Sequence, residues 1–167
     1  MTMPIQAIRL VRIGVVSSWA VFSIHHAYEA GLAHSNGPIG IVVISTVILL
    51  ATLALLECYE RTGSQSAYAL FSVLTLLWWV GAIGLVEGFY GHTLKDLLYF
   101  LFGVAPTALP RTPLGLTYDV PTNLFGEVTG GLPFVFAILV AVAWFRLEVQ
   151  RRAEAAARRG QQANAGG

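Results

Sequence analysis

The chain has 167 residues, of which 56% are hydrophobic and only 11% are charged, and its mean hydropathy is +0.68. A water-soluble domain of this length cannot bury so much apolar surface, so the composition predicts a protein for which lipid is part of the solvent. The single cysteine, Cys58, excludes an intramolecular disulfide and a zinc site built from several cysteines, and the net charge of +1 gives no sign of a nucleic-acid partner.

Four stretches are apolar enough to cross a hydrocarbon core, which requires about 20 residues per helix. They are residues 13–32, 38–56, 67–86 and 125–145. The predicted fold class is therefore an all-α integral membrane four-helix bundle, in which residues 1–148 form a single transmembrane domain. Residues 149–167 are rich in alanine and arginine and predict a cytoplasmic tail that begins as a helix and ends partly disordered.

The first apolar stretch has an alternative interpretation as a signal peptide. Arg9 and Arg12 precede the apolar run, and residues 31–33 (Gly-Leu-Ala) would serve as a cleavage site. Cleavage there would leave only three spans, so we favour the uncleaved form.

The arginines define an expected orientation. Arg9 and Arg12 precede the first span, Arg61 lies between the second and third, and five arginines follow residue 145. Because cytoplasmic flanks carry the excess of basic residues, this pattern predicts that both termini and the 57–66 loop are cytoplasmic. Nine arginines against one lysine hint at a GC-rich bacterial genome, so the expected location is a bacterial inner membrane.

The segment between the third and fourth spans would then face outward. Apolar residues recur there at helical spacing, leaving Lys95, Asp96 and Tyr99 on the other side; they are Leu94, Leu97, Leu98, Leu101 and Phe102. This predicts a short amphipathic helix over 94–103 that lies at the membrane interface. Gly88 and Gly91 are expected to form a turn before it, and residues 104–123 predict a proline-rich loop.

The first span ends in an unusual cluster of ionisable residues. At 100° per residue, His25, His26 and Glu29 share one helix face, and a span entering the hydrocarbon near residue 13 would place all three below the outer surface. Ionisable groups at that depth cost a few kcal/mol each on insertion scales. They should therefore point into the bundle and find partners there.

Partners of the required kind end or begin the other spans. Glu87 and His92 follow the third span, and Glu127 begins the fourth. Imidazoles and carboxylates from several helices are the ligands of metal sites in helical bundles. The sequence therefore predicts a transition-metal site formed by His25, His26, Glu29, Glu87 and His92. Iron, copper, zinc and manganese all accept nitrogen and oxygen ligands, so the residue types do not distinguish among them.

Other interpretations of the cluster stay open. His25 and His92 are the candidate axial ligands if the cofactor is a b-type haem, although the glycine-flanked position of His92 predicts a turn there. The cluster could also bind an organic ligand, relay protons, or serve only to hold helices together. The chain contains no glycine-rich phosphate loop, nucleophile elbow, Cys-x-x-Cys pair or repeated histidine boxes.

Two functional hypotheses follow. In the first, the chain is a metal-dependent membrane oxidoreductase that acts on a lipid, a quinone or another small apolar substrate, with Glu127 and Tyr90 as candidate catalytic groups. In the second, it is a non-catalytic accessory or assembly subunit of a larger membrane complex or a homo-oligomer, and the cluster is structural or binds lipid. Metal content and partners that co-purify would distinguish the two.

Overall fold

The computed structural model describes residues 5–34, 36–104 and 123–165. Within these ranges all of the regular secondary structure is helical. The elements are α1 (Ile5–Ala33), α2 (Gly37–Thr62), α3 (Gln65–Leu74), η1 (Thr75–Leu94), α4 (Lys95–Phe102) and α5 (Leu124–Ala165). Four helical segments are long and apolar enough to span a membrane: Gln6–Leu32, Gly37–Thr62, Gln65–Phe102 and Leu124–Gln162. The predicted all-helical class with four candidate spans is confirmed.

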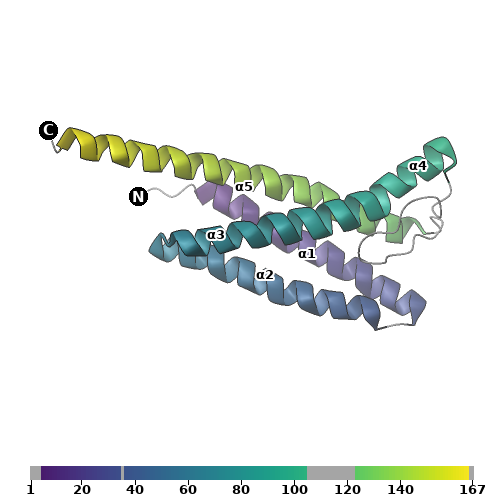
Figure 1. The fold of residues 1–167 in the computed structure, drawn as a ribbon. Coiled ribbons are helices and arrows are strands. Elements are labelled where there is room, and N and C mark those ends of the chain that lie inside the picture. Colours follow the sequence, from purple (N-terminus) through teal and green to yellow (C-terminus); the bar gives the residue numbers. More distant parts are fainter. Residues whose placement is uncertain (1–4, 35, 105–122, 166–167) are drawn as a thin grey trace.

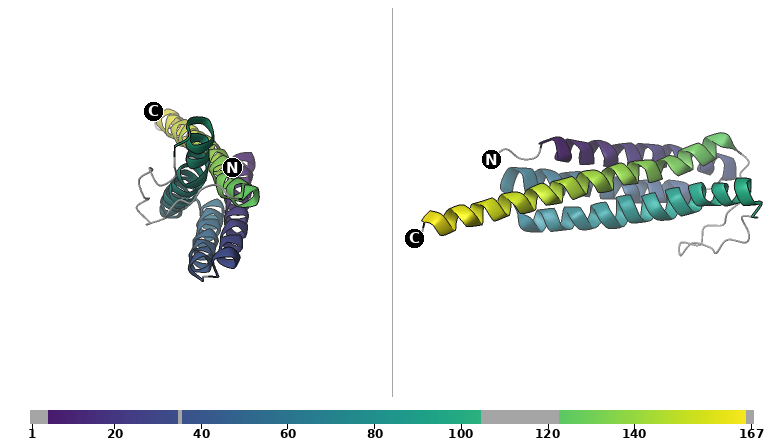
Figure 2. Two further views of the ribbon diagram at one scale, coloured as in Figure 1. Left: turned by 90° about the vertical axis from the view of Figure 1, so that its right-hand side faces the viewer. Right: turned by 90° about the horizontal axis from the view of Figure 1, so that it is seen from above.

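The helices run alternately up and down the bundle (Figure 1). Both termini and the α2–α3 turn lie at one end, here called the tail end, whereas the α1–α2 turn, α4 and the start of α5 lie at the other, the α4 end. Figure 2 shows α5 running along the bundle and extending beyond it at the tail end. Its most extensive contacts are with α1 and η1. The ionisable residues of the predicted site therefore gather at the α4 end.

Local sequence signals account for most helix ends. Pro38 lies in the first turn of α2, where its missing N–H costs no hydrogen bond. Gly63 ends α2 in the left-handed conformation with φ of 70°, and the Ser64 side chain accepts a bond from the Ala67 N–H to begin α3. Asn123 caps α5, since its side-chain oxygen accepts from the N–H of Phe125 at 3.0 Å.

The third span differs from its prediction. The chain does not turn at Gly88 and Gly91 but stays helical from Gln65 to Phe102. Both glycines are buried, and a Cβ at Gly88 would lie 2.6 Å from the backbone nitrogen of Phe134. A Cβ at Gly84 would lie 2.1 Å from the side chain of Ala137. These glycines therefore allow η1 and α5 to pack closely, as small residues do between membrane helices.

The amphipathic segment forms α4, which continues η1 directly and ends at Gly103. Its apolar residues Leu101 and Phe102 are exposed, whereas Lys95 is only 5% exposed. Lys95 is buried because its ammonium group binds the Glu127 carboxylate inside the bundle. The location of this helix at the membrane interface stays a prediction. The predicted loop 104–123 lies almost wholly outside the described residues.

The tail begins as a helix, as expected, and α5 continues to Ala165. Alanine favours the helix, and pairs three or four residues apart add to its stability. Glu148 accepts from Arg151 at 2.9 Å and from Arg152, and Glu154 faces Arg158 at 3.8 Å. Partial disorder in 149–167 stays a prediction.

Candidate metal centre

α1 delivers three site residues from consecutive turns at the α4 end. The side chains of His25 and His26 are buried, with exposed fractions of 2% and 5%, whereas the Glu29 side chain is 39% exposed. His26 Nδ1 lies 2.9 Å from Glu29 Oε2, and His25 Nε2 lies 3.3 Å from Glu29 Oε1. The polar face predicted from helical spacing therefore points into the bundle, and Glu29 lies at its edge.

η1 contributes Glu87 and His92, which lie five residues apart. On an ordinary α-helix they would be about 140° apart around the axis. η1 is a π-type helix, in which each N–H bonds to the carbonyl five residues back. This wider winding brings residue i+5 closer around the axis to residue i than an α-helix does, and His92 Nε2 lies 3.6 Å from Glu87 Oε1.

Three imidazole nitrogens surround one carboxylate oxygen at the centre of the site. Glu87 Oε1 lies 4.0 Å from His25 Nε2, 3.8 Å from His26 Nε2 and 3.6 Å from His92 Nε2. These separations are too long for hydrogen bonds. They are close to the spacing of two ligands on one metal ion, which is about 3.4 Å when each lies about 2.1 Å from a tetrahedral centre.

The opposite nitrogen of each of the three imidazoles has a partner of its own. Nδ1 of His26 faces Glu29, and Nδ1 of His92 lies 3.0 Å from Glu127 Oε2. His25 Nδ1 lies 3.3 Å from Thr129 Oγ1, whose hydroxyl proton is already directed at the backbone carbonyl of Phe125 at 2.7 Å. Thr129 and the two carboxylates must therefore accept, and each imidazole donates through Nδ1.

This pattern determines what the imidazoles present to the centre. A neutral imidazole that donates through Nδ1 carries a lone pair on Nε2. The Nε2 atoms of His25 and His26 are buried and make no hydrogen bond with a described residue, although His25 Nε2 lies 3.3 Å from Glu29 Oε1. Lone pairs gathered around a carboxylate are unfavourable unless an imidazole takes up a proton or a metal cation lies between them. Metal-binding histidines commonly have this arrangement, with the other ring nitrogen held by a carboxylate or hydroxyl.

The groups fall into two overlapping sets that could hold a metal ion. One is His25, Glu29 and His92, and the other is His25, His26 and Glu87; within each set the ligand atoms lie within 4.8 Å of one another. His25 belongs to both. A buried group of histidines and glutamates suited to a metal ion is therefore present at the α4 end of the bundle.

Two residues that complete this arrangement were not assigned to the cluster from the sequence. Thr129 fixes the orientation of His25, as described above. Lys95 Nζ donates to Glu127 at 2.9 and 3.0 Å, and Glu127 in turn accepts from His92. The amphipathic pattern of residues 94–102 placed Lys95 on the polar side of the helix, so the sequence did not indicate that Lys95 forms a buried ion pair. The ion pair depends on the packing of α4 and η1 near the start of α5.

Packing holds the imidazole of His92 in place. A Cβ at Gly130 would lie 2.4 Å from His92 Nδ1, so the ring rests directly against the backbone of α5. The rings of His25 and His92 also meet edge to face, with centroids 4.6 Å apart. This direct contact leaves no space for a porphyrin between them, which argues against a haem held by His25 and His92 as axial ligands.

The remaining predicted residues lie as follows. Glu127 belongs to the arrangement as the partner of His92 and Lys95. Tyr90 is partly buried on η1 and belongs to neither of the two metal-binding sets. His34 adopts a positive φ of 48° in the turn after α1, outside the cluster. Tyr28 accepts a hydrogen bond from the Asn123 side chain, which joins the ends of α1 and α5 beside the site.

Comparisons with known proteins found no relative of this chain. No protein-family model, no curated protein and no solved structure matches the chain. The function must therefore be argued from the site itself.

Proposed function

We propose that this chain is a membrane protein that binds a transition-metal ion through His25, His26, Glu87 and His92, with Glu29 as a further ligand at the edge. The observation that carries the proposal is the orientation of the three imidazoles. Each has its Nδ1 engaged by a hydroxyl or carboxylate, and each Nε2 faces Glu87 at a distance suited to shared coordination.

The ligand set favours a particular class of metal. Imidazole nitrogens suit zinc, copper, iron and nickel, whereas magnesium and calcium prefer all-oxygen sites. Three nitrogens with one or two carboxylates are therefore expected to hold iron, copper, zinc or manganese. A metal centre with protein ligands from two helices, packed against a third, would also tie α1, η1 and α5 together.

Glu29 indicates where a substrate would approach. Its side chain is 39% exposed, whereas those of His25 and His26 are nearly inaccessible. The edge of the site at Glu29 is therefore the accessible one, and the surrounding helices are apolar. We propose that a lipid, a quinone or another small apolar molecule reaches the metal there. Oxidation or reduction of that molecule would be the reaction if the metal is iron, copper or manganese, because zinc is not redox-active. Glu127, which accepts from His92 and Lys95, would keep the His92 imidazole oriented toward the metal.

We also propose an orientation for the bundle. Arg9, Arg12 and Arg61 lie at the tail end, together with the five arginines of α5, so this end would face the bacterial cytoplasm. The metal site at the α4 end would then lie on the outer side of the inner membrane.

Elemental mass spectrometry of the detergent-purified protein tests the proposal. We expect close to one transition-metal ion per chain, lost in His92→Gln, and retained in His34→Gln, which removes the histidine outside the site. Well-folded protein without metal in cells supplied with iron, copper, zinc and manganese would refute it. That result, combined with stable co-purification of large partners, would favour the accessory-subunit function.

A further inference from the structure

A second candidate site lies at the tail end of the bundle, remote from the histidines. A cavity of about 740 Å³ opens there between the α2–α3 turn and the tail of α5. Its polar lining includes Tyr59, Arg61, Gln65, Arg151, Arg158 and Arg159. Glu154 is the only acidic residue among the described residues that line it. The lining is therefore strongly basic.

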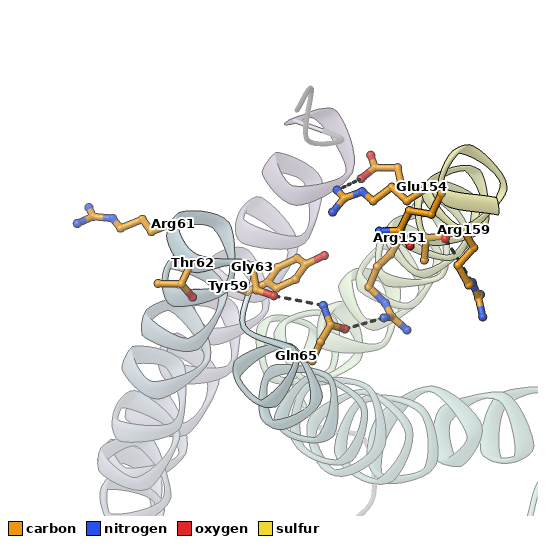
Figure 3. Close-up of a pocket in the computed structure, with 11 residues that line it drawn as sticks. Tyr59, Arg61, Thr62, Gly63, Gln65, Arg151, Glu154 and Arg159 are labelled. Atoms are coloured by element: carbon orange, nitrogen blue, oxygen red, sulfur yellow. Dashed lines mark hydrogen bonds and ion pairs between the residues drawn. The ribbon is translucent and has the colours of Figure 1, made fainter. Parts of the chain in front are cut away.

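The floor of the cavity is built from fixed side chains. Arg151 donates to the Gln65 side chain at 2.9 Å and to Glu148, and its guanidinium lies 4.7 Å from the centre of the Tyr68 ring. Figure 3 shows Gln65 and Arg151 facing each other across the gap between α3 and α5, with Tyr59 beside them. Arg61 lies on the opposite side of the opening and is directed outward. The guanidinium group of Arg151 is thus held in place by contacts within the protein.

The arginines on the rim have spare hydrogen-bonding capacity. Arg158 meets Glu154 only at 3.8 Å, and Arg159 donates to the carbonyl of Ala155 at a long 3.4 Å. Each guanidinium offers five N–H donors in a planar fork that suits phosphate oxygens. Both side chains project from the exposed end of α5, so an anionic group can reach them.

The helices below the cavity favour a lipid over a soluble anion. α3 and α5 are joined in antiparallel order by three polar contacts: Gln65 with Arg151, Tyr68 with Glu148, and Ser72 with Trp144. Further into the bundle from the contact of Gln65 with Arg151, the same two helices expose apolar side chains, namely Leu70, Val73 and Phe145. If the phosphate group of a phospholipid lies at the arginines, its acyl chains can therefore reach the apolar surface of these helices.

We propose that this cavity binds the phosphate headgroup of an anionic phospholipid, with Arg158 and Arg159 as its main ligands and Arg151 on the floor. A basic pocket between membrane helices at the more positive end of a bundle has the chemistry that such headgroups require. The site is independent of the metal centre, because the two lie at opposite ends of the molecule.

Native mass spectrometry of the full chain in detergent would test the proposal. The probes are dioleoylphosphatidylglycerol, dioleoylphosphatidylcholine and inorganic phosphate. We expect phosphatidylglycerol to bind and the Arg158→Gln/Arg159→Gln variant to bind it about 25-fold more weakly, which is about fivefold for each arginine. The matched control is Arg9→Gln/Arg146→Gln, which removes the same charge from exposed positions outside the cavity and should change binding less than twofold.

Each outcome is decisive. Equal weakening in the two variants would overturn the site, because it would show a general effect of charge. Equal binding of phosphatidylcholine and phosphatidylglycerol would overturn the selectivity for anionic headgroups. Inorganic phosphate that binds as tightly as phosphatidylglycerol, and displaces it, would assign the cavity to a soluble phosphate instead. Unchanged melting temperature and metal content in both variants would show that the fold is intact.

Discussion

His92 Nε2 lies 3.6 Å from Glu87 Oε1, although the two residues are five positions apart in the chain. The π-type winding of η1 favours this contact, because it brings residue i+5 closer around the axis to residue i than an α-helix does. The local winding of a single helix thus helps the ligands of the proposed site to meet.

The first prediction concerns Glu87. Replacing it with glutamine removes a negative charge from the centre and adds an N–H donor that can serve the Nε2 lone pairs of His25 and His26. We expect Glu87→Gln to lose the metal and, when both proteins are metal-free, to be more stable than the wild type by about 1 kcal/mol. Thermal unfolding with and without a chelator measures this. A metal-free variant that is less stable than the metal-free wild type would contradict the proposed crowding of lone pairs.

The second prediction concerns Thr129, which accepts from His25 Nδ1. Valine has nearly the same shape but no acceptor, so the His25 ring loses the bond that fixes its orientation. We expect Thr129→Val to weaken metal binding by about tenfold, as such supporting residues do in other metal sites. Thr129→Ser keeps the hydroxyl and should bind as the wild type does. Competition titration with a chromophoric chelator gives both affinities, and equal affinities in the two variants would assign Thr129 no role in orienting His25.

The third prediction concerns the ion pair of Lys95 with Glu127. Lys95→Met takes the ammonium group away from the partly buried Glu127 carboxylate, so we expect a loss of stability of about 3 kcal/mol. The double variant Lys95→Met/Glu127→Gln removes both charges and should recover much of that loss. Thermal unfolding of the two single variants and the double variant measures the coupling. Simple additivity of the two single effects would show that the pair is not coupled.

The fourth prediction tests the packing of His92 on α5. In Gly130→Ala the new methyl group would lie within 2.5 Å of ring atoms, so the His92 ring must move. We expect a loss of stability of about 1–3 kcal/mol together with weaker metal binding. Gly160→Ala is the control, because a Cβ there meets nothing within 4 Å, and it should stabilise the helix by about 0.5–1 kcal/mol. Equal melting temperatures for Gly130→Ala and the wild type would rule out this contact.

Much of the fold could be predicted from the sequence, because apolar length alone identifies membrane spans. The cap of α5 at Asn123 and the proline in the first turn of α2 at Pro38 are local features of the kind that residue type alone favours. The turn expected at Gly88 was wrong, because a glycine that allows close helix packing and one that allows a turn look the same in a sequence.

The candidate site was only partly predictable. Helical spacing placed His25, His26 and Glu29 on one face, and the structure shows them there. The roles of Thr129 and Lys95 depend on which faces of α4, η1 and α5 meet, and that depends on the π-type winding of η1. Neither the winding nor the pairing of helices has a clear signature in the pattern of residues.

X-ray absorption spectroscopy of the purified protein with its native metal would test the central claim most directly. The proposed site predicts about three imidazole nitrogens and a carboxylate oxygen at about 2.0–2.2 Å from the metal. It also predicts that His92→Gln, which does not retain the metal on purification, shows one imidazole fewer when it is reloaded with an excess of the same metal, whereas His34→Gln gives the wild-type spectrum. An all-oxygen shell in the wild type, or a spectrum that His92→Gln leaves unchanged, would contradict a metal centre built on these histidines.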